Sequence, residues 1–393
     1  MERTGGATMQ EKFHQPQMHA DAQRRARDRV EWLLQQAGIG LNGSQPWDMQ
    51  VHDEQLYSRI LTQGTLGLGE AYMDGWWNCQ RLDQFACRAL RAELPRKVGF
   101  TWHDAGLVAR ALVSNLQSKA RAGMVGERHY DLGNRLYECM LDSRMTYTCG
   151  YWREAADLEQ AQEHKLDLVC RKLGLREGQR VLDIGCGWGS FAEFAARRYG
   201  VRVVGITISR EQEELARQRC QGLPVEIRLQ DYRDMRERFD HIVSLGMFEH
   251  VGWKNHRGYM QVVQRCLADD GLFLLHSIGV NRSGIRSDAW IDRHIFPNGN
   301  LPSVAQIGQA IEPDWVMEDW HNFGADYDRT LMAWHANFER RWGELAAHYD
   351  HRFYRMWRYY LLTCAGSFRA RKNQLWQIVL SKGGVPGGYQ APR

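Results

Sequence analysis

The sequence predicts an α/β fold in which a mostly parallel, doubly wound sheet follows a smaller, mainly helical N-terminal domain. The chain has 393 residues, which is more than one average domain and enough to bury large cores. Between residues 180 and 278, short apolar runs alternate with segments of helical spacing, a pattern typical of parallel strands joined by helices. The segments before about residue 114 have helical spacing instead, so we expect two domains.

The elements of the second domain can be placed in order along the chain. Strands are predicted at 180–184, 201–206, 224–229, 240–245 and 272–278, and helices at 127–142, 158–173, 189–199, 210–220 and 254–267. Residues 281–312 form a polar, proline-containing insertion that departs from the alternation. Two further runs, 315–320 and 374–380, are predicted to close the sheet as antiparallel strands, with one long helix over 330–370 between them.

Composition marks the ends of the chain and the junction between the domains. The polar, Gln- and Gly-rich residues 1–20 are predicted to be a disordered tail, and the Gly-rich residues 383–393 a flexible tail. Residues 115–126 are small, polar and basic, as in a linker. These boundaries leave an N-terminal domain at 21–114 and a second domain at 127–382.

The overall composition excludes several classes of protein. A net charge of +4 is small for this length and argues against a dedicated nucleic-acid binder. Nine cysteines are scattered without a Cys-x-x-Cys pair, which indicates free thiols in the cytoplasm and no metal site. No run of about 18 apolar residues and no apolar signal segment occurs, so any membrane contact is expected to be peripheral.

Basic and aromatic clusters are the candidates for such a membrane contact. Arg24 and Arg25 lie in an amphipathic helix, and Trp76 and Trp77 follow a glycine; for each cluster, packing over a core is the more common explanation. A further helix carries basic residues spaced by three, and a solvated stripe above a core is its alternative explanation. These residues are Arg352, Arg355 and Arg358.

A glycine-rich turn follows the first predicted strand of the second domain. Gly185, Gly187 and Gly189 permit positive φ and remove Cβ atoms where a ligand would press on the backbone, and the helix that follows presents free N–H groups. Asp183 precedes the first glycine by two residues. This Gly-x-Gly-x-Gly pattern fits an S-adenosylmethionine site better than the dinucleotide pattern, although a nucleotide site or a plain structural turn remains an alternative.

The next two strands end in residues that can bind the rest of such a cofactor. The acid usual for ribose hydroxyls is missing after the second strand, where Thr207 and Gln212 can exchange hydrogen bonds with the same hydroxyls. Asp231 and Tyr232 follow the third strand and can meet an adenine edge and face. A helix cap with a solvated Asp231 is an equally good explanation.

Two titratable residues stand out near the ends of later strands. Glu249 lies in an apolar loop, where an unpaired buried carboxylate costs several kcal/mol. His276 lies inside an apolar strand, where a satisfied core histidine is the common alternative to a catalytic one. Cys364 is a possible nucleophile, but a helical Cys beside Ala and Gly is an ordinary packing residue.

Several motifs together resemble the bacterial cyclopropane-fatty-acyl-phospholipid synthases, which are related to the mycolic acid cyclopropane synthases. The motifs are HYDLGN at 129–134, YTCGYW at 147–152, VLDIGCGWG at 181–189, FEH at 248–250, LLH at 274–276 and FGADYD at 323–328. LGLGE at 66–70 and GWW at 75–77 match the phospholipid branch. The likeness runs from about residue 42 to 379. It departs mildly at Thr148, where Ser is common, and at Gly150, where Ala is common.

The resemblance implies a Rossmann-like class I methyltransferase domain, here 127–382, behind an N-terminal lipid- and membrane-associated domain. It implies transfer of a methylene group from S-adenosylmethionine to the cis double bond of unsaturated acyl chains in membrane phospholipids. A carbocation forms, and bound bicarbonate removes a proton from the added methyl so that the ring closes. Bicarbonate would be held by Cys149, Glu249, His276, the backbone of Ile278 and Tyr327, while Tyr147 and Thr148 join the residues that bind S-adenosylmethionine.

The resemblance also implies a homodimer that works as a peripheral protein on the inner face of the cytoplasmic membrane. Two alternatives remain at this point. One is a related lipid or small-molecule C-methyltransferase that does not close a ring. The other is a non-catalytic membrane-binding protein with a relic site, which the intact set of polar residues disfavours.

Overall fold

The computed structural model describes residues 9–98, 133–285, 287–312 and 314–393. The predicted linker at 115–126, and the first residues of the helix predicted from 127, lie outside these residues. In the described part of the chain, no helix combines the length and the apolar character that a bilayer-spanning segment needs.

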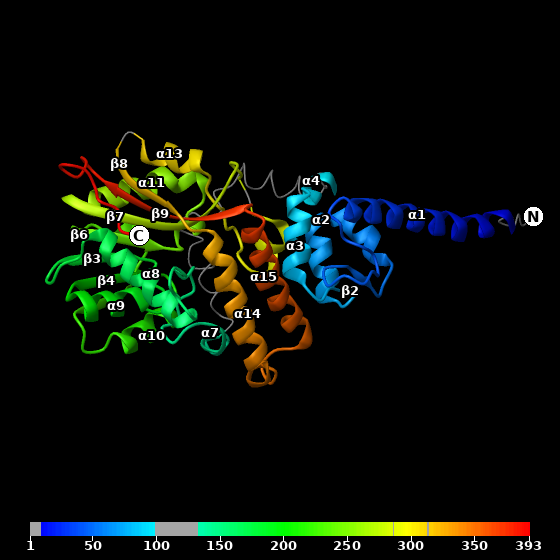
Figure 1. Ribbon diagram of the computed structural model, residues 1–393, viewed down its shortest axis with the longest axis horizontal. Helices are drawn as coiled ribbons and strands as arrows, with labels where there is room; N and C mark the ends of the chain where they lie inside the picture. The colour runs from blue at the N-terminus through cyan, green and yellow to red at the C-terminus, as the bar shows by residue number, and fades with distance from the viewer. Residues whose placement is uncertain (1–8, 99–132, 286, 313) are drawn as a thin grey trace, which may run out of the picture.

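A seven-stranded sheet forms the centre of the second domain within the described residues (Figure 1). Its strand order is β5-β4-β3-β6-β7-β9-β8. The strands β5, β4, β3, β6 and β7 are parallel, and β9 runs antiparallel to both of its neighbours. The strands are β3 (Arg180–Ile184), β4 (Arg202–Thr207), β5 (Val225–Leu229), β6 (Phe239–Leu245), β7 (Leu267–Val280), β8 (Val316–Asn322) and β9 (Asn373–Ser381). The predicted doubly wound sheet with two closing antiparallel strands is therefore confirmed.

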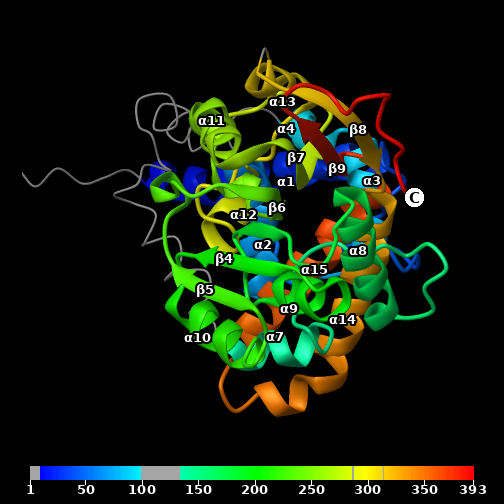
Figure 2. The ribbon, with the colours of Figure 1, turned by 90° about the vertical axis from the view of Figure 1, so that its left-hand side faces the viewer.

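Helices cover both faces of this sheet because successive strand residues point to opposite sides. Val181 and Val203 pack with one layer, which comprises α8 (Leu158–Leu173), α9 (Ser190–Tyr199) and α10 (Arg210–Arg219). Leu182 and Val204 pack with the other, which comprises α11 (His256–Cys266) and α13 (Val304–Ile311). The two layers lie on opposite sides of the strands in Figure 2. Buried aliphatic strands with helices on both faces are the expected arrangement for a parallel sheet.

The region predicted as one long helix over 330–370 is instead two antiparallel helices, so this prediction was wrong. The helices are α14 (Ala325–Leu345) and α15 (His351–Arg369). Asp350 starts the second helix because its carboxylate accepts a hydrogen bond from the backbone N–H of Phe353 at 2.7 Å. The insertion at 281–312 also contains helices that were not predicted, namely α12 (Ala289–His294) and α13, which Ser303 and Gln306 begin with a capping box.

The N-terminal domain is mainly helical, as predicted. It contains α1 (Met9–Gln35), β1 (Gln50–Val51), α2 (Gln55–Met73), β2 (Trp77–Asn78), α3 (Leu82–Arg91) and α4 (Leu94–Val98), and it is followed after the gap by the short α7 (Asn134–Met140). In Figure 1, α1 projects from this domain away from the sheet. Because α1 begins at Met9, the prediction of a disordered tail over 1–20 was wrong for residues 9–20; residues 1–8 are outside the described part.

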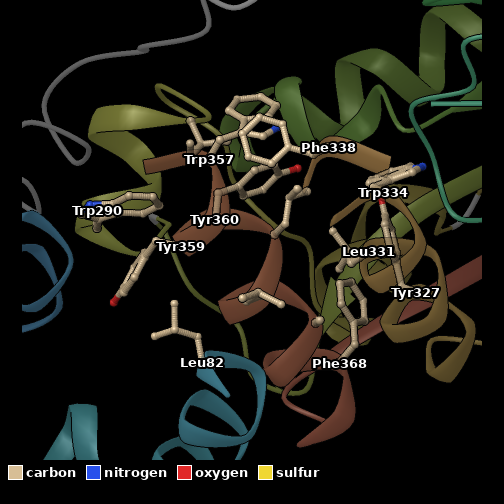
Figure 3. Close-up of a cluster of buried hydrophobic side chains, with 14 of the residues drawn as sticks. Leu82, Trp290, Tyr327, Leu331, Trp334, Phe338, Trp357, Tyr359, Tyr360 and Phe368 are labelled. Atoms are coloured by element: carbon tan, nitrogen blue, oxygen red, sulfur yellow. The ribbon is translucent and has the colours of Figure 1, made fainter. Parts of the chain in front are cut away.

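Helix α15 joins the N-terminal domain to the second domain. A Cβ added at Gly366 would lie 2.5 Å from the carbonyl oxygen of Asp83, so only glycine allows α15 to approach α3 this closely. Arg369 donates to the buried carboxylate of Asp83, which Arg81 also contacts. Figure 3 shows Trp357, Tyr359, Tyr360 and Phe368 of α15 between Leu82 and Trp290 on one side and Tyr327, Leu331, Trp334 and Phe338 of α14 on the other.

This interface uses several residues that were candidates for membrane contact. Trp77 is fully buried, and Arg355 donates to the backbone carbonyl oxygens of Tyr72 and Trp77. Arg358 donates to the hydroxyl of Tyr72 at 2.6 Å. Trp77, Arg355 and Arg358 therefore hold the domains together, and their assignment to a membrane surface was wrong.

The C-terminal tail packs against the second domain, which corrects the prediction of a flexible segment at 383–393. Tyr389 donates to the backbone carbonyl oxygen of Lys172 at 2.7 Å, and its ring packs on the core beneath α8 together with Val385. The guanidinium of Arg393 donates to both carboxylate oxygens of Asp319, at 2.6 and 2.8 Å. The glycines of this tail form turns between these anchors, and they do not prevent packing.

Candidate active site

A cavity of about 800 Å³ opens at the carboxyl ends of β3, β4 and β6. Ligands of doubly wound sheets bind at this edge, where the strand order reverses. The cavity extends from the glycine turn after β3 to Leu90 of α3 and Pro95 of α4, so both domains contribute to its wall. Apolar and aromatic side chains line much of the space between these ends, including Phe296, Leu331, Tyr360 and Phe368.

The glycine turn has the backbone conformation that its sequence predicts. Gly185, Gly187 and Gly189 have φ of 81°, 53° and 81°, and α9 begins directly after them. Only Gly187 faces open space, because a Cβ added there would meet no atom within 4 Å. A Cβ at Gly185 would lie 2.8 Å from Met247, and one at Gly189 would lie 3.2 Å from Ala216. The expectation that all three glycines make room for a ligand therefore holds for Gly187 alone; the other two allow the protein to pack.

Asp183 places a buried carboxylate beside this turn. Its side chain is 1% exposed, and neither carboxylate oxygen has a hydrogen-bond partner among the described residues. Burial raises the pKa of Asp183 to about 7, against the opposing charge of Lys165. Lys165 is itself fully buried and donates to Thr148 Oγ1 at 2.9 Å. An unpartnered carboxylate that lines the cavity fits a cationic ligand, and S-adenosylmethionine carries both an ammonium and a sulfonium.

Thr207 and Gln212 lie together at the end of β4 and the start of α10. The hydroxyl of Thr207 donates to Gln212 Oε1 at 2.8 Å and accepts from the backbone N–H of Ser209 at 3.2 Å. Both side chains are buried and line the cavity. They present hydroxyl and amide groups where a ribose acid is usual, as the sequence predicts.

Asp231 and Tyr232 also line the cavity, after β5. The carboxylate of Asp231 accepts from the backbone N–H of Arg233 at 2.9 Å and pairs with its guanidinium at 2.7 Å, so the helix-cap explanation describes the observed contacts. The ring of Tyr232 packs edge-on against Tyr259, with centroids 5.0 Å apart. Asp231 can therefore line the cavity and also cap the short 3₁₀ helix Tyr232–Asp234.

Tyr147 and Thr148 form part of the cavity wall. The hydroxyl groups of Tyr147 and Tyr360 are 2.8 Å apart, and the ring of Tyr147 packs on Trp334 with a centroid distance of 5.2 Å. These contacts join the segment before α8 to both α14 and α15. The wall is aromatic at this point, which keeps water away from whatever occupies the cavity.

Glu249 and Ile278 meet where β6 and β7 end. Glu249 Oε1 accepts a hydrogen bond from the backbone N–H of Ile278 at 2.7 Å, and Oε2 is buried with no partner among the described residues. Burial raises the pKa of Glu249 to about 7, although the hydrogen bond from Ile278 opposes this shift. Both residues line the cavity. The pair therefore offers a carboxyl group that can hold or release a proton near neutral pH.

His276 and Tyr327, the next two predicted residues, come from β7 and α14. His276 is two residues before Ile278 on the same face of β7; its Nδ1 faces Gln377 Nε2 at 3.4 Å, and its Nε2 is buried with no partner among the described residues. Burial lowers the pKa of His276 well below its usual range, so the ring is neutral. Tyr327 lines the cavity, and its ring stacks on Phe368 with the ring centroids 4.5 Å apart.

Among the described residues, Tyr327 lines the cavity and Cys149 does not. Its thiol faces the carbonyl oxygen of Gly150 at 3.2 Å and the hydroxyl of Thr330 at 3.8 Å, and it is fully buried. In the described part of the chain, the cavity wall includes Glu249, Ile278 and Tyr327 but not Cys149 or His276. The structure therefore brings the first three to one surface and leaves the other two behind it.

Sequence reasoning missed Lys165. The signal was a lysine at a core position of the helix over 158–173, where Leu158, Ala161, Leu166 and Val169 repeat at helical spacing and are all buried. Cys364 also lines the cavity, and burial raises its pKa to about 12. A thiol with this pKa stays protonated at neutral pH, which excludes it as a ready nucleophile.

Comparisons with known proteins agree with this geometry. The family model for mycolic acid cyclopropane synthetase matches residues 117–378. The chain is 55% identical to the cyclopropane-fatty-acyl-phospholipid synthase of Escherichia coli strain K12 over 361 residues, which are 92% of this chain and 94% of that protein. The solved structure of cyclopropane synthase MmaA2 from Mycobacterium tuberculosis matches with a TM-score of 0.64 at 30% identity, covering 68% of this chain and 100% of that one.

A second solved structure is mycolic acid cyclopropane synthase CmaA1 complexed with SAH and CTAB, with a TM-score of 0.62 at 30% identity over 66% of this chain and 98% of that one. These matches confirm the expected class I methyltransferase fold. With the glycine turn and the unpartnered Asp183 at the edge of the sheet, the chain belongs to the mycolic acid cyclopropane synthetase family and is an S-adenosylmethionine-dependent methyltransferase.

Proposed function

We propose that this protein transfers a methylene group from S-adenosylmethionine to the cis double bond of unsaturated acyl chains in membrane phospholipids, forming a cyclopropane ring. The observation that carries this proposal is the cavity. It joins a cofactor turn at one end to an aromatic and aliphatic wall that reaches the N-terminal domain at the other. An acyl chain fits such a wall, and the 55% identical Escherichia coli relative is named for the same reaction on phospholipids.

Residues around the glycine turn hold the cofactor. The open backbone at Gly187 admits it, Asp183 receives its cationic end, Thr207 and Gln212 bind its ribose hydroxyls, and Tyr232 meets its adenine. S-adenosylmethionine supplies an electrophilic methyl group on a sulfonium. An alkene is a weak nucleophile, so the protein contributes by holding the double bond in line with that methyl and by excluding water.

Residues at the ends of β6 and β7 handle the proton. Methyl transfer leaves a carbocation on the acyl chain, and loss of one proton from the added methyl closes the ring. Bicarbonate supplies the base and the stabilising negative charge when it is bound. Glu249 Oε2 lines the cavity without a partner among the described residues, and it fits an anion that shares a proton with it, because two ionised anions do not coexist in a dry site. His276 lies behind this wall, where its neutral ring supports the site from the second layer.

Tyr327 and the Ile278 backbone complete the anion site, and Cys149 supports it from behind the wall. The ring of Tyr327 lines the cavity, where its face stabilises a cation and its hydroxyl donates to the anion. The N–H of Ile278 donates to Glu249 Oε1, so it acts on the anion by holding this carboxyl group in place. Cys149 lies behind the wall and packs against Thr330.

The protein works as a homodimer on the inner face of the cytoplasmic membrane, which it contacts as a peripheral protein. The substrate lies in a bilayer, and the end of the cavity at Leu90 and Pro95 belongs to the N-terminal domain. This domain therefore receives the acyl chain. The exposed Arg24, Arg25 and Trp32 of α1 provide its basic and aromatic surface.

Fatty-acid profiling tests the proposal. We expect a bacterium without cyclopropane lipids to gain cyclopropane fatty acids when it expresses this chain, detected by mass spectrometry and by the shielded ring protons in NMR spectra. A C-methyltransferase without ring closure would add the same carbon but give methyl-branched or methylene products. Such products would contradict ring closure, and unchanged lipids would contradict transfer to phospholipid acyl chains altogether.

A further inference from the structure

A row of polar side chains crosses three strands behind the catalytic cavity. In the register of the sheet, His276 on β7 lies opposite Gln377 on β9, and Gln377 lies opposite His321 on β8. Residues directly opposite one another on neighbouring strands project to the same face, so the three side chains form one row. The row is buried at its inner end, where His276 is 1% and Gln377 0% exposed.

A buried lysine ends this row on the outer side. Lys172 of α8 is 0% exposed, and its Nζ lies 3.0 Å from Asp319 Oδ2 and 3.2 Å from His321 Nδ1. Asp319 is also bonded to Arg393 of the C-terminal tail. An ammonium has three donors and no acceptor, so His321 Nδ1 accepts in this contact. The neutral ring of His321 therefore carries its proton on Nε2.

The donor and acceptor at the inner end of the row can be assigned at Gln377. The amide nitrogen of Gln377 faces His276 Nδ1 at 3.4 Å, and its amide oxygen is buried with no hydrogen bond among the described residues. His321 makes no hydrogen bond with this oxygen, so the contact with His276 is what defines the hydrogen bonding: an amide nitrogen can donate but cannot accept. His276 Nδ1 then accepts, and the ring carries its proton on Nε2.

We propose that Gln377 is a positioning residue that fixes His276 as the Nε2–H tautomer through the contact of its amide nitrogen with His276 Nδ1. This proposal rests on the proposed function for its purpose. His276 Nε2 is buried with no partner among the described residues, so the fixed tautomer keeps a hydrogen-bond donor behind the cavity wall, on the strand that carries Ile278. Burial lowers the pKa of His276 well below its usual range, which agrees with a neutral donor.

The tautomer can be measured without substrate. We would label the fifteen histidines with ¹⁵N in their imidazole rings, record long-range ¹H–¹⁵N spectra of the ligand-free protein at pH 7, and assign His276 by its loss in His276→Gln. The proposal expects Nδ1 of His276 to be unprotonated and Nε2 protonated. A protonated Nδ1, as the other tautomer or as an imidazolium, would overturn it. The wild-type spectrum decides this point even if no variant folds.

Two variants test the positioning role. Gln377→Met keeps the side-chain length but removes the amide, so we expect a mixture of His276 tautomers and a kcat at least about tenfold lower, with unchanged affinity for S-adenosylhomocysteine. Gln374→Met is the matched control, because Gln374 lies on the same strand but three residues away, on the opposite face.

The outcomes separate this inference from the proposed function. An unchanged His276 spectrum in folded Gln377→Met would overturn the positioning role, as would an equal effect of Gln374→Met. A fixed Nε2–H tautomer that Gln377→Met disturbs would support the role even if lipid profiling finds no cyclopropane product. In that case the proposed function fails, and the role of Gln377 stands.

Discussion

Glu249 Oε1 accepts a 2.7 Å hydrogen bond from the backbone N–H of Ile278, while its other carboxylate oxygen is buried without a partner among the described residues. This asymmetry separates a structural role from a chemical one, because one oxygen fixes the side chain and the other is left for the reaction. A glutamine can reproduce the first role, since its carbonyl oxygen accepts the same hydrogen bond. It cannot exchange a proton near neutral pH.

We therefore expect Glu249→Gln to fold and to bind S-adenosylhomocysteine with nearly wild-type affinity, while turnover falls by at least about 10²-fold. Calorimetry and a lipid assay measure the two quantities. Glu193→Gln is the control, because Glu193 is a similarly shielded carboxylate on α9 that pairs with Arg197 outside the cavity wall. Near wild-type turnover in folded Glu249→Gln would remove Glu249 from the mechanism.

Gly187 provides a test of the cofactor site. Its φ of 53° and the open space beside it predict that Gly187→Val abolishes cofactor binding, because the branched side chain would occupy the cavity. Folding should be affected less than binding. Gly178→Val controls for backbone strain, since Gly178 has φ of 83°, faces open space and lies outside the cavity wall. If calorimetry finds unchanged affinity in Gly187→Val, the cofactor does not lie against this turn.

Asp183 should make cofactor binding depend on pH. Its folded pKa of about 7 lies above the ordinary value of 3.8, so between these pH values the free folded protein holds a proton that the unfolded chain has lost. This contribution to the stability of the free protein falls as pH rises through that window. A cationic ligand favours the ionised carboxylate, so binding releases the proton below pH 7.

Affinity for S-adenosylhomocysteine, whose amino group is also cationic, should therefore weaken by up to about tenfold per unit as pH falls from 7 to 5, and level off above pH 7. Calorimetry in buffers of different ionisation enthalpy measures both the affinity and the released proton. Asp183→Asn should bind weakly at every pH without this slope. Glu249 has a similar pKa, so Glu249→Gln must retain the slope; if it loses the slope instead, Glu249 is the titrating group.

The sequence was sufficient for the central strands because β3, β4 and β6 are short and rich in buried aliphatic residues. It was not sufficient for the break between α14 and α15. Residues 346–350 are compatible with a continuing helix, and only the cap at Asp350 marks the new start. The sequence also could not show that Gly185 and Gly189 serve packing, because Met247 and Ala216 come from elsewhere in the chain.

The candidate site was predictable where one strand and its loop supply the residues, as with Asp183, Gly187 and Glu249. The row of His276, Gln377 and His321 was not, because β9 enters the sheet between β7 and β8 although it is last in the chain. Trp77 and Arg355 were misassigned for a similar reason. Each looks exposed and amphipathic in its own segment, and only the packing of α15 on the N-terminal domain buries or pairs it.

The exposed side of α1 is a remaining candidate surface for the proposed membrane contact. Arg24 and Arg25 are exposed there, and Trp32, which is 50% exposed, lies 4.5 Å under the guanidinium of Arg29. Anionic lipids attract such a basic, tryptophan-bearing helix, with roughly 1 kcal/mol for each basic residue near the surface. We expect Arg24→Gln/Arg25→Gln in the full chain to weaken co-sedimentation with anionic vesicles by about tenfold or more, and rising salt to weaken wild-type binding.

The control is Arg197→Gln/Arg198→Gln, which removes two exposed arginines from α9 and should leave vesicle binding unchanged. Equal losses in the two double variants would mean that overall charge drives binding, and α1 would then not be the docking surface.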